Sequence, residues 1–147
     1  GHIFVNNLLT GDSKYHRPLL FVWQPDSLCR QLPTPLLKHL DHNIYVRSTA
    51  KTSAPLILWS PVTGEQCQAR FESLNDLRNL FPQFSVNSSS FDTYEGPLFK
   101  SAELGNYQLL PTAPGARSGM QLPAEVRKLL APTAKNSQYV GAYPRLP

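Results

Sequence analysis

Four side chains of this sequence have the chemistry of a sugar-binding surface. They are Trp23, Tyr45, Arg47 and Trp59. Aromatic rings pack against the C–H faces of pyranose sugars, and a guanidinium pairs with a uronate carboxylate through two parallel hydrogen bonds. All four lie at short apolar segments that are expected to be strands, in which alternate side chains point to opposite faces. If these strands stack in register, the four side chains form one stripe.

The exposure of that stripe depends on which face of each strand meets the core. We expect an inward set of Leu20, Val22, Ile44, Val46, Leu56 and Leu58, and an outward set of Phe21, Trp23, Tyr45, Arg47, Ile57 and Trp59. The alternative is a second small core, in which the connection Gln24–Asp41 or the segment Ser73–Phe81 covers the outward set. Large aromatic side chains are more often packed than displayed, so both interpretations stay open.

The acidic and histidine residues do not form a recognisable catalytic or metal-binding pattern. The aspartates Asp12, Asp26, Asp41, Asp76 and Asp92 are scattered singly, and His2, His16 and His39 lack the spacing of metal ligands. Asp41 and His42 are adjacent, and neighbours on a strand point to opposite faces, so we expect a solvated loop pair. The sequence therefore predicts no metal and no cofactor, and assigns no catalytic residue.

Two cysteines, Cys29 and Cys67, are too few for a disulfide framework. They could pair in an oxidising compartment or remain as two partly buried thiols, and the spacing does not decide between these states.

Composition limits the class of protein. The 147 residues carry 14 basic and 10 acidic side chains, a formal charge of +4, and 41% of them are apolar. These values fit one globular domain over residues 1–147, and the mild, evenly spread charge argues against a nucleic-acid partner. No apolar run reaches the roughly 18–20 residues of a membrane span, and no basic segment precedes the first apolar run as in a signal peptide.

Fourteen prolines and many turn-forming residues favour short strands over long helices. The expected strands are 3–9, 19–23, 44–47, 56–59, 68–71, 98–100 and 107–110. Helical spacing and a Ser73–Asp76 capping pair predict a helix over Ser73–Phe81, and proline and charge placement predict another over Pro123–Ala131. The segment Thr34–Leu40 is expected to form one or two helical turns.

Several short motifs follow one another in a distinctive order. They are Gly96-Pro97-Leu98-Phe99, Leu104-Gly105-Asn106-Tyr107-Gln108-Leu109, Pro111-Thr112-Ala113-Pro114-Gly115, Val140-Gly141-Ala142-Tyr143, Asn6-Asn7, His42-Asn43-Ile44-Tyr45 and Phe71–Arg78. Their order resembles that of right-handed parallel β-helix proteins of the pectate-lyase-like superfamily. In such a fold Asn6, Asn7 and Asn43 suit the corners, where asparagine tolerates a left-handed backbone and bonds the neighbouring coil. Leu98, Phe99, Tyr107 and Leu109 are then expected to form a closing core.

The resemblance implies a mostly β fold, the last coils and closing segment of a parallel β-helix with two or three short helices. It implies a C-terminal fragment or subunit of a secreted or periplasmic carbohydrate-active protein, of lyase or hydrolase type, whose catalytic coils lie upstream. This chain alone is then expected to be inactive and to bind polysaccharide. A non-catalytic carbohydrate-binding module and a structural assembly subunit are the alternatives, the latter because no polar cap precedes Ile3, so that missing coils or a protein partner would cover the first strand.

Overall fold

The computed structural model describes residues 1–48, 54–63, 67–130 and 139–141, and its regular elements are short. The strands are β1 (His2–Val5), β2 (Leu8–Gly11), β3 (Leu20–Val22), β4 (Leu37–Asp41), β5 (Ile44–Arg47), β6 (Ile57–Trp59), β7 (Ala69–Phe71), β8 (Ser89–Phe91), β9 (Phe99–Ser101) and β10 (Asn106–Leu109). The helices are α1 (Asp26–Cys29), α2 (Leu74–Leu80), α3 (Ala124–Arg127) and the 3-10 turn η1 (Ala102–Leu104). The expected mostly β class with few short helices is confirmed.

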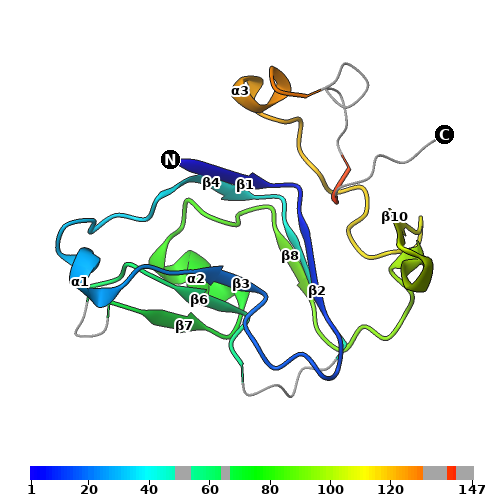
Figure 1. Cartoon of the computed structure of the whole chain (residues 1–147), viewed down its shortest axis with the longest axis horizontal. Coiled ribbons are helices and arrows are strands. Elements are labelled where there is room, and N and C mark those ends of the chain that lie inside the picture. The colour runs from blue at the N-terminus through cyan, green and yellow to red at the C-terminus, as the bar shows by residue number, and fades with distance from the viewer. Residues whose placement is uncertain (49–53, 64–66, 131–138, 142–147) are drawn as a thin grey trace.

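The first three strands pair in parallel with the next three, strand by strand. The pairs are β1 with β4, β2 with β5 and β3 with β6. Figure 1 shows these pairs on three different sides of the strand-bearing part of the chain. β8 adds a third parallel strand beside β5, whereas β7 pairs with β6 in the antiparallel sense.

The sequence separation of paired residues is nearly constant. Phe4 pairs with Leu40 and Leu8 with Ile44, both 36 residues apart, and Leu20 pairs with Ile57, 37 residues apart. A parallel pair requires a long connection between its strands, and here each connection passes through the two other sheets. The first and second sets of three strands therefore repeat one another in order and direction.

Asparagine and histidine form the bends between the first two sheets. The predicted strand 3–9 is two strands, β1 and β2, separated at Asn6, which has a φ of 59°. His42 has a φ of 52° at the matching bend between β4 and β5. Asparagine and histidine are enriched among the residues that adopt such positive φ values. Asn6 thus has the left-handed backbone that was expected for it.

A fully buried asparagine joins the bends of successive strands. The Asn43 Oδ1 accepts hydrogen bonds from the main-chain N–H and from Nδ2 of Asn7, both at 3.0 Å. Its Nδ2 donates to the main-chain oxygen of Phe4 at 2.9 Å, and its own N–H donates to the Ser88 hydroxyl at 3.0 Å. The predicted bonding of Asn7 and Asn43 across neighbouring strands is thus present.

Two apolar clusters lie on opposite faces of β5. The main cluster contains Tyr45 with Trp59 and Leu40, and the second contains Ile44 and Val46 with Val140. All four residues of β5 are buried as a result. Both faces of β5 are therefore covered, as in the second-core alternative of the sequence analysis, although the C-terminal segment and not the segment 24–41 covers the Ile44 and Val46 face.

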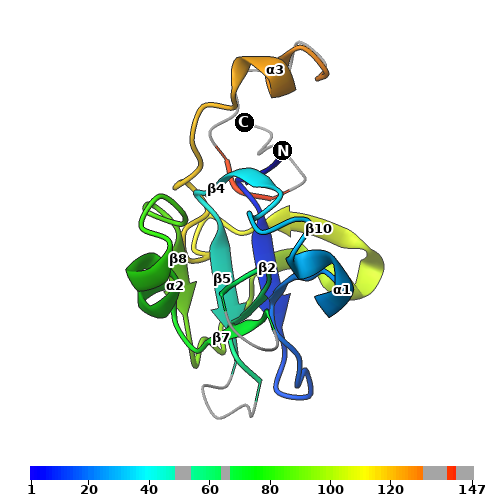
Figure 2. The ribbon, with the colours of Figure 1, turned by 90° about the vertical axis from the view of Figure 1, so that its left-hand side faces the viewer.

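Helix α2 closes one end of the main cluster. Ser73 and Asp76 cap it reciprocally: the Asp76 carboxylate accepts the Ser73 N–H at 2.8 Å, and the Ser73 hydroxyl accepts the Asp76 N–H at 3.2 Å. Leu74 and Leu77 are buried beneath it. The helix predicted over this segment is confirmed, and Figure 2 shows it beside β8, across β5 from β2.

The segment Thr34–Leu40 is not helical. Residues Leu37–Asp41 form β4, because pairing with β1 supplies main-chain hydrogen bonds that outweigh a weak local helix preference. Helix α3 covers only part of the predicted Pro123–Ala131 segment, whose last residue lies outside the described residues.

The expected closing core is looser than predicted. Leu98, Phe99 and Leu109 are half-buried, but Tyr107 is 50% exposed and packs edge-to-face against Phe99 with 5.5 Å between ring centroids. β9 and β10 form a two-stranded antiparallel hairpin that projects from the other strands in Figure 1. A two-stranded hairpin has little to bury against, so its outer ring stays in water. Ala142 and Tyr143 lie outside the described residues.

Candidate functional site

Two aromatic rings stand on the outer face of the β3–β6–β7 sheet. Phe21 is 57% exposed and Trp23 is 53% exposed, and their rings stack with 6.5 Å between centroids and 24° between planes. They project outward because Leu20 and Val22, the alternate residues of β3, pack in the main cluster. We call Phe21 and Trp23 the aromatic platform.

The neighbouring strands contribute to the same face. Phe21 pairs with Leu58 of β6, and Leu58 pairs with Arg70 of β7. Residues at one register position share a face, so an aromatic ring, an aliphatic side chain and a guanidinium follow one another at the strand spacing of about 4.8 Å. Leu58 is half-buried, whereas Arg70 is exposed.

The backbone that carries Trp23 is held on both sides. The Ser60 N–H donates to the main-chain oxygen of Val22 at 2.8 Å, and the Gln24 N–H donates to the Ser60 hydroxyl at 2.8 Å. The Gln24 side chain is buried and donates to the main-chain oxygen of Leu32 at 2.9 Å. Trp23 therefore follows a strand whose end is fixed to β6, so its ring is presented from an ordered backbone.

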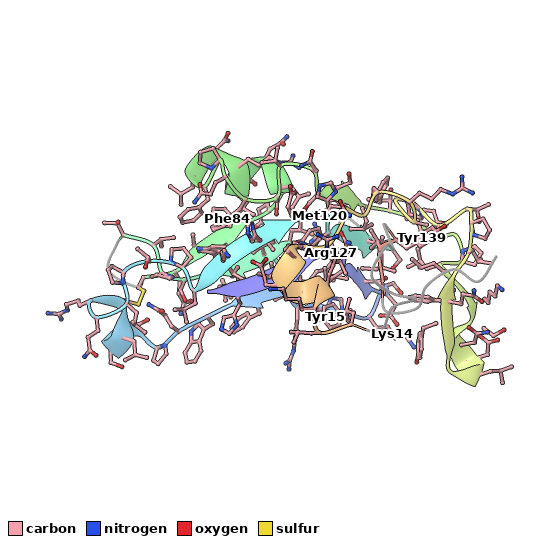
Figure 3. The ribbon with its side chains drawn as sticks, turned by 90° about the horizontal axis from the view of Figure 1, so that it is seen from above. Lys14, Tyr15, Phe84, Met120, Arg127 and Tyr139 are labelled. Carbon is pink, nitrogen blue, oxygen red and sulfur yellow. A yellow bond between two sulfur atoms is a disulfide. The ribbon has the colours of Figure 1, made fainter. Side chains whose placement is uncertain are left out.

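A disulfide joins the connection after Trp23 to the β6–β7 side of the molecule. Cys29 and Cys67 are bonded, with 6.2 Å between their Cα atoms, and the bond is the yellow stick pair in Figure 3. Of the two states that the sequence left open, the structure has the paired one. The bond closes a segment of 38 residues that includes β4, β5 and β6.

Tyr45 and Trp59 do not share the exposed face of Trp23. They are 1% and 0% exposed, and Trp59 packs against Phe81 and Phe84 with 5.2 and 5.5 Å between ring centroids. The predicted outward orientation of Tyr45, Ile57 and Trp59 is wrong, and the alternative of a core beneath the α2 segment is correct for Trp59. Burial also raises the pKa of the Tyr45 phenol, which keeps it neutral.

For Ile57 and Trp59 the error lies in the register between β3 and β6. Leu20 pairs with Ile57 and Val22 with Trp59, so Ile57 and Trp59 share the inward face of β3. The sequence analysis aligned Leu56 and Leu58 with that face instead. A shift of one residue moves every side chain of a strand to the other face.

Arg47 is engaged within the fold. It is 7% exposed, its Nε donates to Asp92 Oδ1 at 2.9 Å, and its Nη1 donates to the main-chain oxygen of Ala54 at 3.2 Å. A partly buried ion pair of this kind fixes the end of β5 against the segment after β8. Arg47 therefore ties two segments together and does not lie beside Trp23 on an open surface.

Asp41 and His42 form part of a bend. The Asp41 carboxylate accepts the main-chain N–H and the Nδ2 of Asn87 at 2.7 and 2.8 Å, and its Oδ2 lies 3.9 Å from His42 Nε2. Burial opposes ionisation of Asp41, but the hydrogen bonds from Asn87 outweigh it and lower the pKa. His42 Nδ1 lies 2.8 Å from the main-chain oxygen of Ser118. These partners occupy the groups that acid–base chemistry would need.

The described residues contain no group of three or more His, Cys, Asp or Glu side chains placed to hold a metal ion. Among them there is also no helix long and apolar enough to cross a membrane. A loop with two basic side chains precedes the platform: Lys14 and Arg17 are exposed in the connection from β2 to β3, together with His16 and the acidic Asp12. We call this connection the basic loop. The sequence analysis placed Phe21 on the outward face but did not select it, and alternation with Leu20 and Val22 was the signal for it.

No family model, curated protein or solved structure matches this chain.

Proposed function

We propose that this chain belongs to an extracytoplasmic, carbohydrate-active parallel β-helix protein and binds polysaccharide without cleaving it. The observation that carries the binding proposal is the aromatic platform, two stacked rings that are each more than half exposed. Such rings offer apolar faces to the C–H groups of a sugar, and water leaves both surfaces on contact.

The parallel pairing supports the coil architecture. A coil here means one circuit of three strands, and the proposed coils are β1–β2–β3 and β4–β5–β6. The near-constant separation of 36–37 residues and the asparagine bonds between bends are what stacked coils require. The same pairs, on three sides in Figure 1, agree with the resemblance on which this proposal rests.

The engagement of the acidic groups supports a binding role over a catalytic one. Asp41 is bonded to Asn87, Asp76 caps α2, and Asp92 pairs with Arg47. Glycosidic cleavage by paired carboxylates needs two such groups that converge on one bond. We infer that catalytic coils, if the whole protein is an enzyme, lie outside this chain.

The disulfide supports an extracytoplasmic location. Disulfides persist in oxidising compartments and are rare where thioredoxin and glutathione keep thiols reduced. Cys67 is buried at 3% exposure, and the bond links two segments that carry the sugar-binding face. The oxidised state therefore joins two segments next to the proposed site.

The basic loop favours acidic polysaccharides. Lys14 and Arg17 lie just before β3 with one carboxylate, Asp12, in the same loop, and the chain carries a net charge of +4 with histidine neutral. A cationic flank attracts uronates or sulfated sugars, and this attraction weakens with salt. Affinity for pectin, alginate or glycosaminoglycans is therefore expected to fall between 50 and 500 mM salt, whereas the stacking contribution persists.

The test is titration of the purified chain with these polysaccharides, together with product detection. Trp23→Ala and Phe21→Ala are each expected to weaken binding about fivefold, from roughly 1 kcal/mol per ring. Tyr107→Ala is the matched control, because Tyr107 is 50% exposed but lies on the distant hairpin. Equal affinity of the Trp23 variant and the Tyr107 variant would refute the platform, and release of oligosaccharides would refute the non-catalytic role.

A further inference from the structure

The first three strands share an open edge. β1, β2 and β3 are each the outermost strand of their sheet, and within the described residues no strand pairs with their outer sides. Seen from above in Figure 3, the strand-bearing part runs from the green α2 ribbon through the cyan β4 to the violet β1, so α2 lies at the opposite end from these edges. The three edges therefore face the same way.

Core side chains are less completely buried at the end of the molecule that carries β1, β2 and β3. Leu40, Tyr45 and Trp59 of the second set are at most 1% exposed. Their paired residues in the first set are only partly buried, although they pack in the same cluster: these residues are Phe4, Leu9 and Val22. The apolar core is thus closed at α2 and incomplete at β1–β2–β3.

The hydrogen bonds between successive bends also end at β1–β2–β3, the side where the core is incomplete. Each bend residue accepts the N–H of the bend before it: Ser88 accepts from Asn43, and Asn43 accepts from Asn7. Asn7 occupies the first place in this series, and its Oδ1 accepts no hydrogen bond within the described residues. Whereas Asn43 donates its Nδ2 back to Phe4 of the preceding set, Asn7 donates its Nδ2 to Val5 of its own segment and forward to Asn43.

We propose that the edges of β1, β2 and β3 dock one further coil of about 36 residues, connected to this chain on the N-terminal side of β1. Its strands run parallel to these three, its apolar side chains cover Phe4 and Leu9, and the N–H of its bend donates to Asn7 Oδ1. A polypeptide edge is the matching ligand because parallel strands satisfy the unpaired main-chain groups. The proposal rests on the coil arrangement above and not on sugar binding.

The topology favours a covalently connected coil. In the described chain, the connection 23–36 leads from β3 to β4 and so starts the second set beside the first. A preceding coil reaches the start of β1 by the same path, with no change of strand direction. A separate copy of this chain would instead meet these edges in the antiparallel sense if it docked through its own open end.

The test is a tandem protein in which a second copy of residues 1–36 precedes Gly1, with Cys29→Ser in the added copy. The 36-residue shift places the added Asn7 above the original one. We expect the melting temperature to rise by about 5 °C or more, and the amides of β1 and β2 to exchange at least about tenfold more slowly. An unchanged melting temperature with an unprotected added copy would overturn the proposal.

Two comparisons make the result specific. Asn7→Ala at the original position is expected to lower the melting temperature more in the tandem protein than in the parent, because only there does its Oδ1 have a donor. If the tandem protein does not fold, a labelled peptide of residues 1–36 with Cys29→Ser is titrated into the parent. Saturable binding weakened by Asn7→Ala supports the surface, and no binding at millimolar peptide overturns it.

Sedimentation velocity tests whether a second copy of this chain, and not a connected coil, covers the edges of β1, β2 and β3. A parent that dimerises through these edges while the tandem protein stays monomeric would show that a second copy, and not a connected coil, is the partner, which overturns the proposal. The sugar test is independent. If the added coil does not stabilise the chain but polysaccharide still binds, only the docking surface is refuted. If the added coil stabilises the chain but polysaccharide does not bind, only the platform is refuted.

Discussion

Asn43 is expected to be the most important polar residue of the fold, and Asn43→Ala is the change that tests this. The side chain is 0% exposed and makes three hydrogen bonds, two from Asn7 and one to the main-chain oxygen of Phe4. Net contributions near 1 kcal/mol per bond give about 3 kcal/mol. Water that enters the space of the missing carboxamide recovers part of this, and orphaned main-chain groups add to it, so we expect a loss of about 2–4 kcal/mol.

The measurement is urea unfolding of parent and variant at constant disulfide state, followed by circular dichroism, with the loss taken from the shift in midpoint at constant slope. Asn87→Ala is the matched control, because Asn87 also bonds another bend through its side chain but is exposed. Its removal is expected to cost about 0.5–1 kcal/mol. A loss for Asn43→Ala no larger than that of Asn87→Ala would refute the bonding argument.

A second substitution separates the two bonding roles of Asn43. Asn43→Asp keeps an acceptor for Asn7 but turns a carboxylate oxygen toward the main-chain oxygen of Phe4. Burial disfavours the charged form, so the folded-state pKa of the new carboxyl is raised and stability falls as the pH rises through it. At pH 3 the protonated carboxyl can donate to Phe4 and recover part of the loss. Equal destabilisation at pH 3 and pH 7 relative to the parent would contradict this assignment.

Three further changes test other parts of the fold. Trp59→Ala is expected to cost about 3–5 kcal/mol, because the indole is 0% exposed, and a melting temperature equal to that of the parent would show that the ring is not in the core. Replacing Cys29 and Cys67 by Ala is expected to lower the free energy of unfolding by about 4 kcal/mol from the entropy of a 38-residue segment, measured by urea unfolding against the oxidised parent. For Asp41 the folded-state pKa is lowered, so its contribution is present above the ordinary pKa of 3.8 and is lost as the pH falls through the folded value. Asp41→Asn should therefore flatten the acid limb of the stability curve, and an unchanged limb would refute that contribution.

Local signals predicted the elements whose own residues specify them. The Ser73–Asp76 cap and the spacing of Leu74 and Leu77 define α2, and the structure has both. β5 has the predicted bounds Ile44–Arg47 because all four residues are buried and the bends beside it contain Asn43 and turn-forming residues. The cap and the spacing in α2 are local signals, and the apolar run of β5 is visible in the sequence although distant segments bury it, which is why a single sequence reveals both.

Two strands were not predicted because pairing, and not composition, forms them. β4 contains Lys38 and His39, and β8 lies in a run of serines, so neither has an apolar pattern. Each is a strand because β1 or β5 supplies the partner. Strand propensity mostly reflects packing against neighbours, and those neighbours are about 36–45 residues away in sequence.

Of the four residues that the sequence analysis placed on one exposed stripe, one is exposed in the structure. Trp23 is exposed as expected, whereas Tyr45, Arg47 and Trp59 are buried. Alternation divided β3 correctly into two faces. Alternation alone does not say which face of β5 or β6 points into the main cluster. That choice depends on register, which the sequence did not specify.

The second apolar cluster explains why the outer face of β5 is covered whereas Phe21 and Trp23, in and just after β3, are exposed. The outer face of β5 holds Ile44 and Val46, and the C-terminal segment covers it through Val140. No such cover lies on Phe21 and Trp23 within the described residues, so they keep more than half of their surface in water. Exposed apolar patches on soluble proteins commonly mark interaction sites, and two rings stacked beside a clamped backbone lose little conformational freedom when a ligand binds. The platform is thus an uncovered part of the outer surface with an ordered backbone, which is what the proposed sugar binding requires.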